Sequence, residues 1–282
     1  MPEPDHGPED GPVHGPDPLA DLALLALTAL EAGALALGYV GSPGAVREKP
    51  EGLGPVSEAD LAVDRLLRDR LLAARPGYGW LSEESEDGPA RLGAGRVFVV
   101  DPIDGTRAFL AGERAWSHAL AVVEAARVVA GVVHLPALGK TYAAARGHGA
   151  TRNGAAIAAS GRAALDGSRL LAAGSQLDAR FWPGGAPRVE RLFRPSIAYR
   201  LCFVADGTAD GMVTFRETWE WDLAAGALIA AEAGATVTDA HGAAVAYNRA
   251  HPAVPGVLAA APGVHRALLA RLGAAAGEGS AP

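Results

Sequence analysis

Cysteine is almost absent from this chain of 282 residues, because Cys202 is the only one. A single thiol excludes an intramolecular disulfide framework and any zinc site built from several cysteines. Cys202 lies in an apolar run, residues 197–205, where a buried structural thiol is the ordinary interpretation. We therefore expect Cys202 to contribute packing and no chemistry.

Positive charge is also scarce. The 25 Lys and Arg residues are outnumbered by 32 Asp and Glu residues, which gives a net charge of −7. No long basic run is present, so we expect no nucleic-acid polymer as a partner. An acidic protein can still bind an anionic substrate when bound cations reverse the charge of its site. Because 49% of the residues are hydrophobic, the chain can bury one large core or two fused smaller ones.

The N-terminal region combines a polar segment with an apolar one. Residues 1–17 are rich in proline, glycine and acidic side chains, which predicts a disordered tail. Residues 22–40 are apolar and about long enough to span a bilayer. Acidic residues flank and interrupt this run and no Lys or Arg precedes it, so we favour a long, largely buried helix over residues 18–39 of a cytoplasmic protein without a membrane.

Alternating helical and β-rich patterns continue along the chain. Ser57 is a favourable N-cap for a helix over residues 58–74. Short β-forming runs predict antiparallel strands at residues 97–100, 119–123, 127–134 and 140–145. Further strands are predicted at residues 169–173, 211–215, 236–238 and 256–261, and further helices at 196–205, 219–233 and 263–272. This alternation predicts a layered α/β or α+β fold. We expect an N-terminal α+β domain over 18–160, a C-terminal α/β domain over 161–273 and a frayed tail over 274–282.

The most informative segment is residues 97–110, VFVVDPIDGTRAFL. Four β-forming residues place Asp101 at the end of a strand, and Pro102 then interrupts the alternation of side chains. Asp101 and Asp104 can therefore converge on one point, with the carbonyl of Ile103 as a further candidate ligand. Carboxylates, carbonyls and water are the ligands that Mg²⁺ favours, so the segment indicates a divalent metal site.

The next two residues add a candidate phosphate site. Gly105 and Thr106 lie at a predicted helix start, where unpaired N–H groups attract phosphate. Carboxylates beside such a cradle would repel the substrate unless metal ions lay between them, so the combination indicates metal-bridged phosphate. The alternative is that Asp104 and Gly105 form an ordinary Asp-Gly turn.

Two other acidic segments strengthen the metal interpretation. Glu83 and Glu84 follow an apolar run, and Asp222 lies at the start of a strongly apolar helix. Alone, the glutamates suit a solvated loop and Asp222 suits an acid that complements a helix dipole. Two other catalytic motifs are absent. A P-loop ending at Lys140 would need its first glycine at the position of His134, and no Gly-x-Ser-x-Gly nucleophile elbow is present. The eight histidines show no close metal-ligand spacing, so we expect surface or structural roles for them.

Four segments together resemble the inositol monophosphatase superfamily of metal-dependent, lithium-sensitive sugar and nucleotide phosphatases. They are PVSEAD at 55–60, LSEES at 81–85, DPIDGT at 101–106 and WDLAAG at 221–226. The likeness covers about residues 20–270. It implies a layered αβαβα fold with a large antiparallel sheet and a smaller mixed sheet, two or three Mg²⁺ ions per site, and a homodimer.

The resemblance also implies a role for each matching residue. Glu83, Asp101 and the Ile103 carbonyl would hold one Mg²⁺, and Asp101, Asp104 and Asp222 would hold the second.

Catalysis would be a two-metal, in-line attack by water on a small phosphorylated substrate. Glu83 and Thr106 would orient the water, and Asp60 would hydrogen-bond Thr106. The implied substrate-binding residues in these segments are Asp104, Gly105, Thr106 and Asp222. The loop 50–54 is longer than in the family, so Lys49 receives no role.

Substrate preference is inferred from weaker features. Inositol phosphatases usually carry a glutamate in the strand before the Trp-Asp segment, but residues 213–216 contain no acid. Residues 134–139 and 220–222 are similar to the bacterial, CysQ-like 3'(2'),5'-bisphosphate nucleotidases. Arg200 and Arg216 would bind a second phosphate there, unless they form surface ion pairs. We therefore expect hydrolysis of adenosine 3',5'-bisphosphate to AMP and phosphate. The alternatives are an inositol-1-monophosphatase, another sugar or histidinol phosphate phosphatase, and a non-catalytic phospholigand-binding relative.

Overall fold

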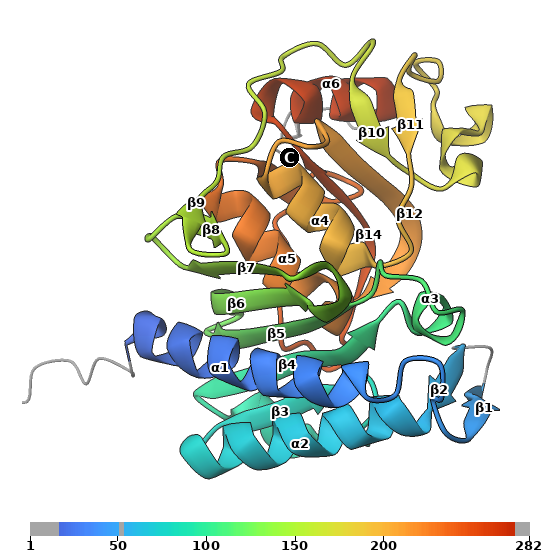
Figure 1. The fold of residues 1–282 in the computed structure, drawn as a ribbon. Coiled ribbons are helices and arrows are strands. Elements are labelled where there is room, and N and C mark those ends of the chain that lie inside the picture. The colour runs from blue at the N-terminus through green and yellow to red at the C-terminus, as the bar shows by residue number, and fades with distance from the viewer. Residues whose placement is uncertain (1–16, 51–53, 274–282) are drawn as a thin grey trace, which may run out of the picture.

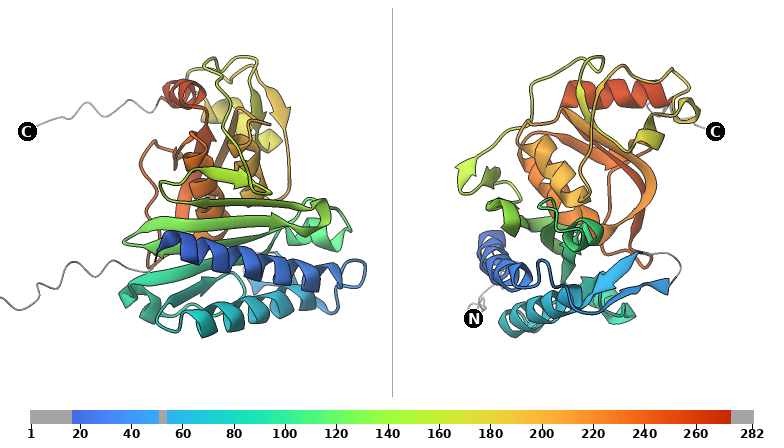
Figure 2. Two further views of the ribbon diagram at one scale, coloured as in Figure 1. Left: turned by 60° about the vertical axis from the view of Figure 1, so that its left-hand side comes forward. Right: turned by 45° about the vertical axis from the view of Figure 1, so that its right-hand side comes forward.

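Helical and sheet layers alternate through the molecule (Figure 1). The computed structural model describes residues 17–50 and 54–273. Helices α1 and α2 cover one face of a seven-stranded sheet, α4 and α5 lie between that sheet and a five-stranded one, and α6 covers the far side of the second sheet (Figures 1 and 2). The layered αβαβα architecture is therefore confirmed. The expected tails fall outside the described residues, except Asp17, whose side chain accepts a hydrogen bond from the Leu19 amide and caps α1.

The first layer follows from its capping residues. Helix α2 spans Glu58–Ala74, as predicted, because Ser57 and Asp60 form a reciprocal capping box at its start. Helix α1 spans Pro18–Leu37 and ends two residues earlier than predicted. By length and composition α1 could cross a membrane. Only 39% of its most apolar window is buried, so the expectation of a largely buried helix is wrong for its outer face. The short strands β1 (Val46–Glu48) and β2 (Pro55–Ser57) pair between the two helices.

The seven-stranded sheet has the order β3-β4-β5-β6-β7-β8-β9. Its strands are β3 (Gly79–Ser82), β4 (Arg96–Asp104), β5 (Ser117–Glu124), β6 (Arg127–Leu135), β7 (Lys140–Ala145), β8 (Ala150–Arg152) and β9 (Ala155–Ala156). All neighbours are antiparallel except β3 and β4, which run parallel. The four strands predicted to be antiparallel, within β4 to β7, pair in that way. Strand β3 was not predicted, and it runs parallel because the η2 turn (Pro89–Gly93) lets the chain re-enter the sheet in the same direction.

The second sheet is mixed and smaller, as expected, with the order β11-β10-β12-β14-β13. Its strands are β10 (Arg169–Leu171), β11 (Glu190–Leu192), β12 (Gly211–Trp219), β13 (Thr236–Asp239) and β14 (Ala253–Ala260). The helices around it are α4 (Ile197–Ala205), α5 (Glu220–Glu232) and α6 (Pro262–Leu272). Short 3-10 turns connect the elements: η3 (Pro136–Leu138), η4 (Gly174–Leu177) and η5 (Ala179–Phe181).

The largest core lies between the two sheets. It joins β4 and β5 residues such as Val99 to α4 and α5 residues such as Leu223. A Cβ added at Gly131 of β6 would lie 3.0 Å from the Ala225 Cα, so small residues allow α5 to pack closely on the first sheet. Cys202 is fully buried in this core, as predicted, and burial raises the pKa of its thiol. The core spans the predicted division at residue 160, which remains a prediction.

Candidate active site

An irregularity in β4 shapes the centre of the site. The pairing of β4 with β5 is regular up to Asp101 and resumes only at Asp104, so the segment between them bulges. Pro102 lies in this bulge, as its missing N–H requires. Gly105 follows with a φ of 97°, a left-handed conformation that favours glycine, and the short helix α3 (Thr106–Leu110) begins after it. The predicted convergence of the two aspartates is confirmed.

The parallel pairing of β3 with β4 brings a third carboxylate to the same edge. Ser82 pairs with Val100, and the Glu83 amide donates a hydrogen bond to the Val100 carbonyl over 3.3 Å. Two parallel strands end at the same edge of their sheet, so Glu83 leaves β3 beside Asp101. An antiparallel pairing would have placed them at opposite ends.

Helix α5 supplies the fourth carboxylate. Asp222 lies in its first turn, and carboxylate oxygens of Asp101, Asp104 and Asp222 all lie within 4.8 Å of one another. Both oxygens of Asp101 are buried, and no hydrogen-bond donor among the described residues reaches them. Clustered carboxylate oxygens, with the two of Asp101 free of donors, are the ligand set that hard divalent cations prefer, so these residues fit Mg²⁺.

The electrostatics of the cluster agree with this assignment. Burial raises the pKa of Asp101 and of Asp222 well above the usual range, and the neighbouring carboxylates raise both further. Burial also raises the pKa of Asp104, to about 6, although it accepts hydrogen bonds from the Ser196 hydroxyl at 2.6 Å and the Ala198 amide at 2.7 Å. Such a cluster ionises fully at neutral pH when positive charge is bound in it.

Lys49 is a site residue that the sequence left without a role. Its Nζ lies 2.7 Å from Oε1 of Glu83 and 2.7 Å from Oε1 of Glu84. Burial alone would lower the pKa of Lys49, but the two glutamates outweigh that effect and raise it. Burial raises the pKa of Glu84 to about 7. Glu83 therefore borders the three-aspartate cluster while its carboxylate is paired with a cation from the chain itself.

The predicted contact between Asp60 and Thr106 is present. The Thr106 hydroxyl lies 3.2 Å from Oδ1 of Asp60 and 3.1 Å from the Ile103 carbonyl, so it can donate to either oxygen. Oδ2 of Asp60 accepts a hydrogen bond from the Ser57 amide at 2.8 Å. Asp60 is fully buried, so it holds the Thr106 side chain in a fixed position beside the bulge.

A buried histidine supports the bulge from β5. Nδ1 of His118 hydrogen-bonds the Pro102 carbonyl, and its ring lies between Trp116 and His134 at centroid distances of 5.6 Å and 6.2 Å. Burial lowers the pKa of His118 to about 4, so the ring is neutral at neutral pH and Nδ1–H donates. The expected structural role of this histidine is confirmed, although sequence spacing gave no signal that it touches the bulge.

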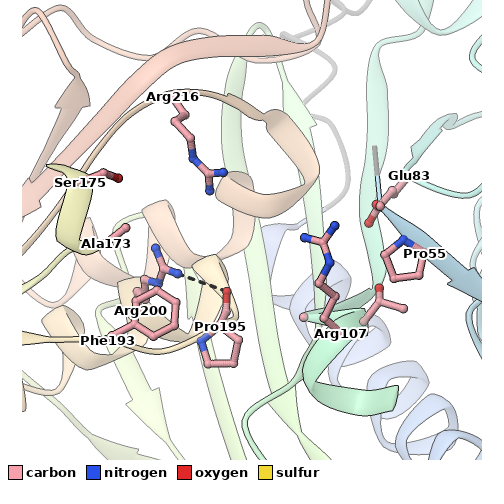
Figure 3. Close-up of a pocket in the computed structure, with 12 residues that line it drawn as sticks. Pro55, Glu83, Arg107, Ala173, Ser175, Phe193, Pro195, Arg200 and Arg216 are labelled. Carbon is pink, nitrogen blue, oxygen red and sulfur yellow. Dashed lines mark hydrogen bonds between the residues drawn. The ribbon is translucent and has the colours of Figure 1, made fainter. Parts of the chain in front are cut away.

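A cleft opens beside the carboxylates (Figure 3). Two cavities of about 450 Å³ and about 380 Å³ share Glu83, Arg107 and Arg216 in their walls, so they lie side by side. The guanidinium groups of Arg107 from α3, Arg200 from α4 and Arg216 from β12 approach this space from different elements. Arg107 was missed in the sequence, although it directly follows Thr106.

The arginines differ in how they are held. Arg200 is only 5% exposed, donates hydrogen bonds to the carbonyls of Arg194 and Pro195, and lies 4.7 Å from the ring centroid of Phe193. The alternative of a surface ion pair is therefore wrong for Arg200. Arg107 and Arg216 are exposed, and their guanidinium groups form no hydrogen bond or ion pair with any residue in the described part of the chain.

Comparison with known proteins agrees with this geometry. The model of the inositol monophosphatase family matches residues 20–278. The chain is 36% identical over 197 residues to an inositol-1-monophosphatase of Rhizobium meliloti, covering 66% of this chain and 73% of that protein. It is 34% identical over 240 residues to a histidinol-phosphatase of Mycobacterium tuberculosis, covering 80% and 87%. The solved structure of an IMPase of Thermotoga maritima has a TM-score of 0.76 at 28% identity, covering 90% of this chain and 96% of that one. The chain thus belongs to the inositol monophosphatase family of Mg²⁺-dependent phosphomonoesterases.

Proposed function

We propose that this enzyme hydrolyses a small phosphate monoester at the cluster of Asp101, Asp104 and Asp222, with at least two Mg²⁺ ions. The supporting observation is the buried Asp101 carboxylate, whose two oxygens face other carboxylates and no donor among the described residues. Bound there, the ions would neutralise the phosphoryl oxygens and lower the pKa of a bound water. Asp101, Asp104 and Asp222 would hold these ions.

The remaining residues orient the reacting groups. The Thr106 hydroxyl, positioned by Asp60, can hold the attacking water beside Glu83. Glu83 would hold a metal ion with a carboxylate whose Oε1 lies 2.7 Å from Nζ of Lys49, so the lysine and the ion would compete for its charge. Gly105 has no side chain, so the phosphate can approach the backbone between the bulge and α3.

The cleft favours a substrate with a second anionic group. Three arginines line it, and two of them have no partner among the described residues. A fork-shaped guanidinium binds a phosphate through two hydrogen bonds. Phe193, 47% exposed at the wall, offers a face for an aromatic base. We therefore propose adenosine 3',5'-bisphosphate, cleaved to AMP and phosphate, as the preferred substrate.

Inositol-1-phosphate is the second candidate, with histidinol phosphate beside it, and the names of the relatives favour both. The structure adds an observation. The pairing of β12 with β14 shifts between Thr214 and Glu217, and Glu217 lines the second cavity. Residues 213–216 contain no acid, as the sequence shows, but Glu217 directly after them can supply one to this cavity. Glu217 is exposed and lies 3.5 Å from His251, so it can turn toward a ligand.

A phosphate-release panel separates the candidates. Purified enzyme is incubated with adenosine 3',5'-bisphosphate, inositol-1-phosphate and histidinol phosphate, each with Mg²⁺ or with EDTA. We expect the nucleotide to give the highest kcat/KM and EDTA to abolish every rate. Fast turnover of inositol-1-phosphate without turnover of the nucleotide would establish the second candidate, and rates that persist in EDTA would refute the metal site.

We also propose that the enzyme is a cytoplasmic homodimer. The single, buried thiol suits a reducing compartment. Fractionation of the source cells, followed by detection of the protein, tests the location. Recovery in the membrane or secreted fraction would contradict it.

A further inference from the structure

A cavity of about 300 Å³ lies beside the C-terminal half of α5, outside the catalytic cleft. We call it the α5 cavity, and its polar wall consists of Arg127, Arg146, Glu232 and Tyr247. It shares no lining residue with the two cavities of the cleft. Glu232 ends α5, about 15 Å along the helix axis from Asp222 in the first turn. A ligand in the α5 cavity would therefore occupy a second site.

Most of the remaining wall is apolar. Leu228 comes from α5, Val128 from β6 and Val237 from β13, and Val245 follows β13 in the chain. Small-molecule sites are typically concave and mostly apolar, with a few polar groups that converge on the ligand. The α5 cavity has this composition, and its volume is at the lower end of the usual range.

Tyr247 is the residue that points to a ligand. Only 7% of it is exposed, yet its hydroxyl forms no hydrogen bond with any residue that the structure describes. Buried hydroxyl groups are normally paired, because an unpaired one costs free energy. Burial also raises the pKa of this hydroxyl, so it stays protonated at neutral pH and can donate. A ligand atom that accepts a hydrogen bond in the cavity would satisfy it.

The turn between β5 and β6 holds Tyr247 in place. The Tyr247 amide donates a hydrogen bond to the Ala126 carbonyl over 3.1 Å. Ala125 and Ala126 form this two-residue turn with φ values of 46° and 61°, which are uncommon for residues that carry a side chain. The turn leads directly into Arg127, so this contact brings Tyr247 beside the segment that supplies a guanidinium to the same wall.

The charged groups of the wall favour an anion. Nε and Nη2 of Arg146 donate to a backbone carbonyl of β6, which leaves Nη1 without a partner among the described residues. The Arg127 side chain forms no hydrogen bond or ion pair within the described chain. Glu232 is already satisfied, because its two oxygens accept hydrogen bonds from the amides of Gly147 and Gly149, each at 2.9 Å. The wall therefore offers free donors and an occupied acceptor.

We propose that the α5 cavity binds a small carboxylate with an apolar body, such as an aryl- or alkyl-acetate. The carboxylate accepts hydrogen bonds from the Tyr247 hydroxyl and from the guanidinium groups of Arg127 and Arg146. The apolar body packs against Leu228 and its neighbours. Sugar phosphates are excluded, because their hydroxyls would be buried unpaired against this apolar wall. The proposal does not depend on the substrate or on the metal site.

Titration of 4-fluorophenylacetate, followed by fluorine NMR in low-salt buffer, tests the site, since salt screens exposed charges. Tyr247→Phe removes only a hydroxyl that has no partner in the described chain, so the fold should be intact. We expect its Kd for the probe to rise at least about tenfold, the value of a hydrogen bond to a charged group. Undiminished binding in Tyr247→Phe would overturn the proposal.

The matched control is Tyr39→Phe. The Tyr39 hydroxyl also forms no hydrogen bond with a described residue, but Tyr39 follows α1 and does not line the cavity. This variant should bind the probe like the wild type. We expect both tyrosine variants to keep the phosphatase kcat/KM of the wild type, because neither residue lines the catalytic cleft.

Further comparisons test the ligand class and the place of binding. The neutral analogue 4-fluorophenylacetamide should bind at least about tenfold more weakly, and equal binding would refute an anion site. Arg127→Gln should weaken probe binding several-fold, whereas Arg68→Gln, on the exposed face of α2, should not. Loss of binding in Arg216→Ala, with full binding in Tyr247→Phe, would place the probe in the catalytic cleft and overturn the proposal. Absence of binding to the wild type at millimolar probe would also overturn it.

Discussion

Removing the charge of Asp101 should make the metal-free protein more stable while it destroys activity. Asp101→Asn keeps the size of the side chain and deletes one carboxylate from a buried cluster that holds at least two others. In EDTA the wild-type carboxylate has no donor among the described residues and faces like charges. An unsatisfied buried polar group costs about 1–3 kcal/mol, and more when it is charged. For a chain of this length each kcal/mol shifts Tm by about 2–4 °C, so we expect a rise of roughly 2–10 °C in EDTA.

The pH dependence follows from the direction of the pKa shift. The pKa of Asp101 is raised above 3.8 in the folded protein, so between the two values the folded state holds a proton that the unfolded state has released. Stability of the metal-free wild type must therefore fall as pH rises through that window. Asp101→Asn has no carboxyl group to release this proton, so its stability should not fall in the same way. In EDTA the stability difference in its favour should grow from about pH 4 toward neutral pH.

In Mg²⁺ we expect the order of stability of wild type and Asp101→Asn to be reversed. A ligand at 100 times its Kd stabilises the folded state by about 2.7 kcal/mol, which corresponds to roughly 5–10 °C here. We expect wild type to gain this shift and Asp101→Asn to lose most of it. We also expect kcat/KM to fall by about a thousandfold, which corresponds to several kcal/mol of lost charge stabilisation.

Thermal unfolding by circular dichroism, in EDTA and in saturating Mg²⁺ over a pH series, measures these effects. The matched control is Asp64→Asn. Asp64 is also buried, but its oxygens accept hydrogen bonds from the hydroxyls of Ser82 at 2.5 Å and Ser85 at 2.6 Å. That variant should be less stable than wild type in EDTA. An Asp101→Asn protein that melts lower than wild type in EDTA, or that keeps the full Mg²⁺ shift, would refute the assigned site.

Three further predictions concern neighbouring residues. Lys49→Met removes the cation from the two glutamates that it bridges, so calorimetry should show several-fold tighter Mg²⁺ binding; weaker binding would mean that Lys49 assists the metal. Arg216→Ala should raise KM for adenosine 3',5'-bisphosphate about 10- to 100-fold, the value of a charge-assisted hydrogen bond, and leave KM for inositol-1-phosphate unchanged; equal effects would exclude a second-anion subsite. His118→Leu leaves the Pro102 carbonyl without its donor and should lower stability to urea by about 1–3 kcal/mol. Because the pKa of His118 is lowered to about 4, wild type should lose stability as pH falls below 6.5, and this loss should be smaller in the variant.

The local sequence was sufficient to predict the structure of those segments in which neighbouring residues fix the backbone conformation. Ser57 and Asp60 satisfy the free amides at the start of α2, and both ends of that helix are where the pattern placed them. The bulge at Pro102 follows in the same way, because a proline cannot complete the ladder of a central strand. The candidate metal ligands were predicted in a different way. The family resemblance over four segments assigned Glu83 and Asp222 to the same site as the 101–104 turn, although they are far from it in the sequence.

Pairings between distant segments were not predictable from such local rules. The parallel alignment of β3 with β4 depends on how the chain crosses between them, and the β-forming pattern of each strand is the same for either direction. The shift in β12 that brings Glu217 to the cleft depends on its partner β14. The contact of Lys49 with the glutamates depends on a loop whose path no residue pattern specifies.

By itself, the sequence determined the layered architecture, the aspartates that meet in the cluster and the apolar character of α1. Only the tertiary structure decided which side of α1 is buried, because that helix is apolar nearly all round and periodicity alone cannot choose a face. It also decided that three arginines share one cleft, since Arg107, Arg200 and Arg216 come from separate elements that meet only after the two sheets have packed. The chemical type of each side chain can be read from the sequence, whereas the distance between two side chains in the folded protein depends on how the whole chain packs.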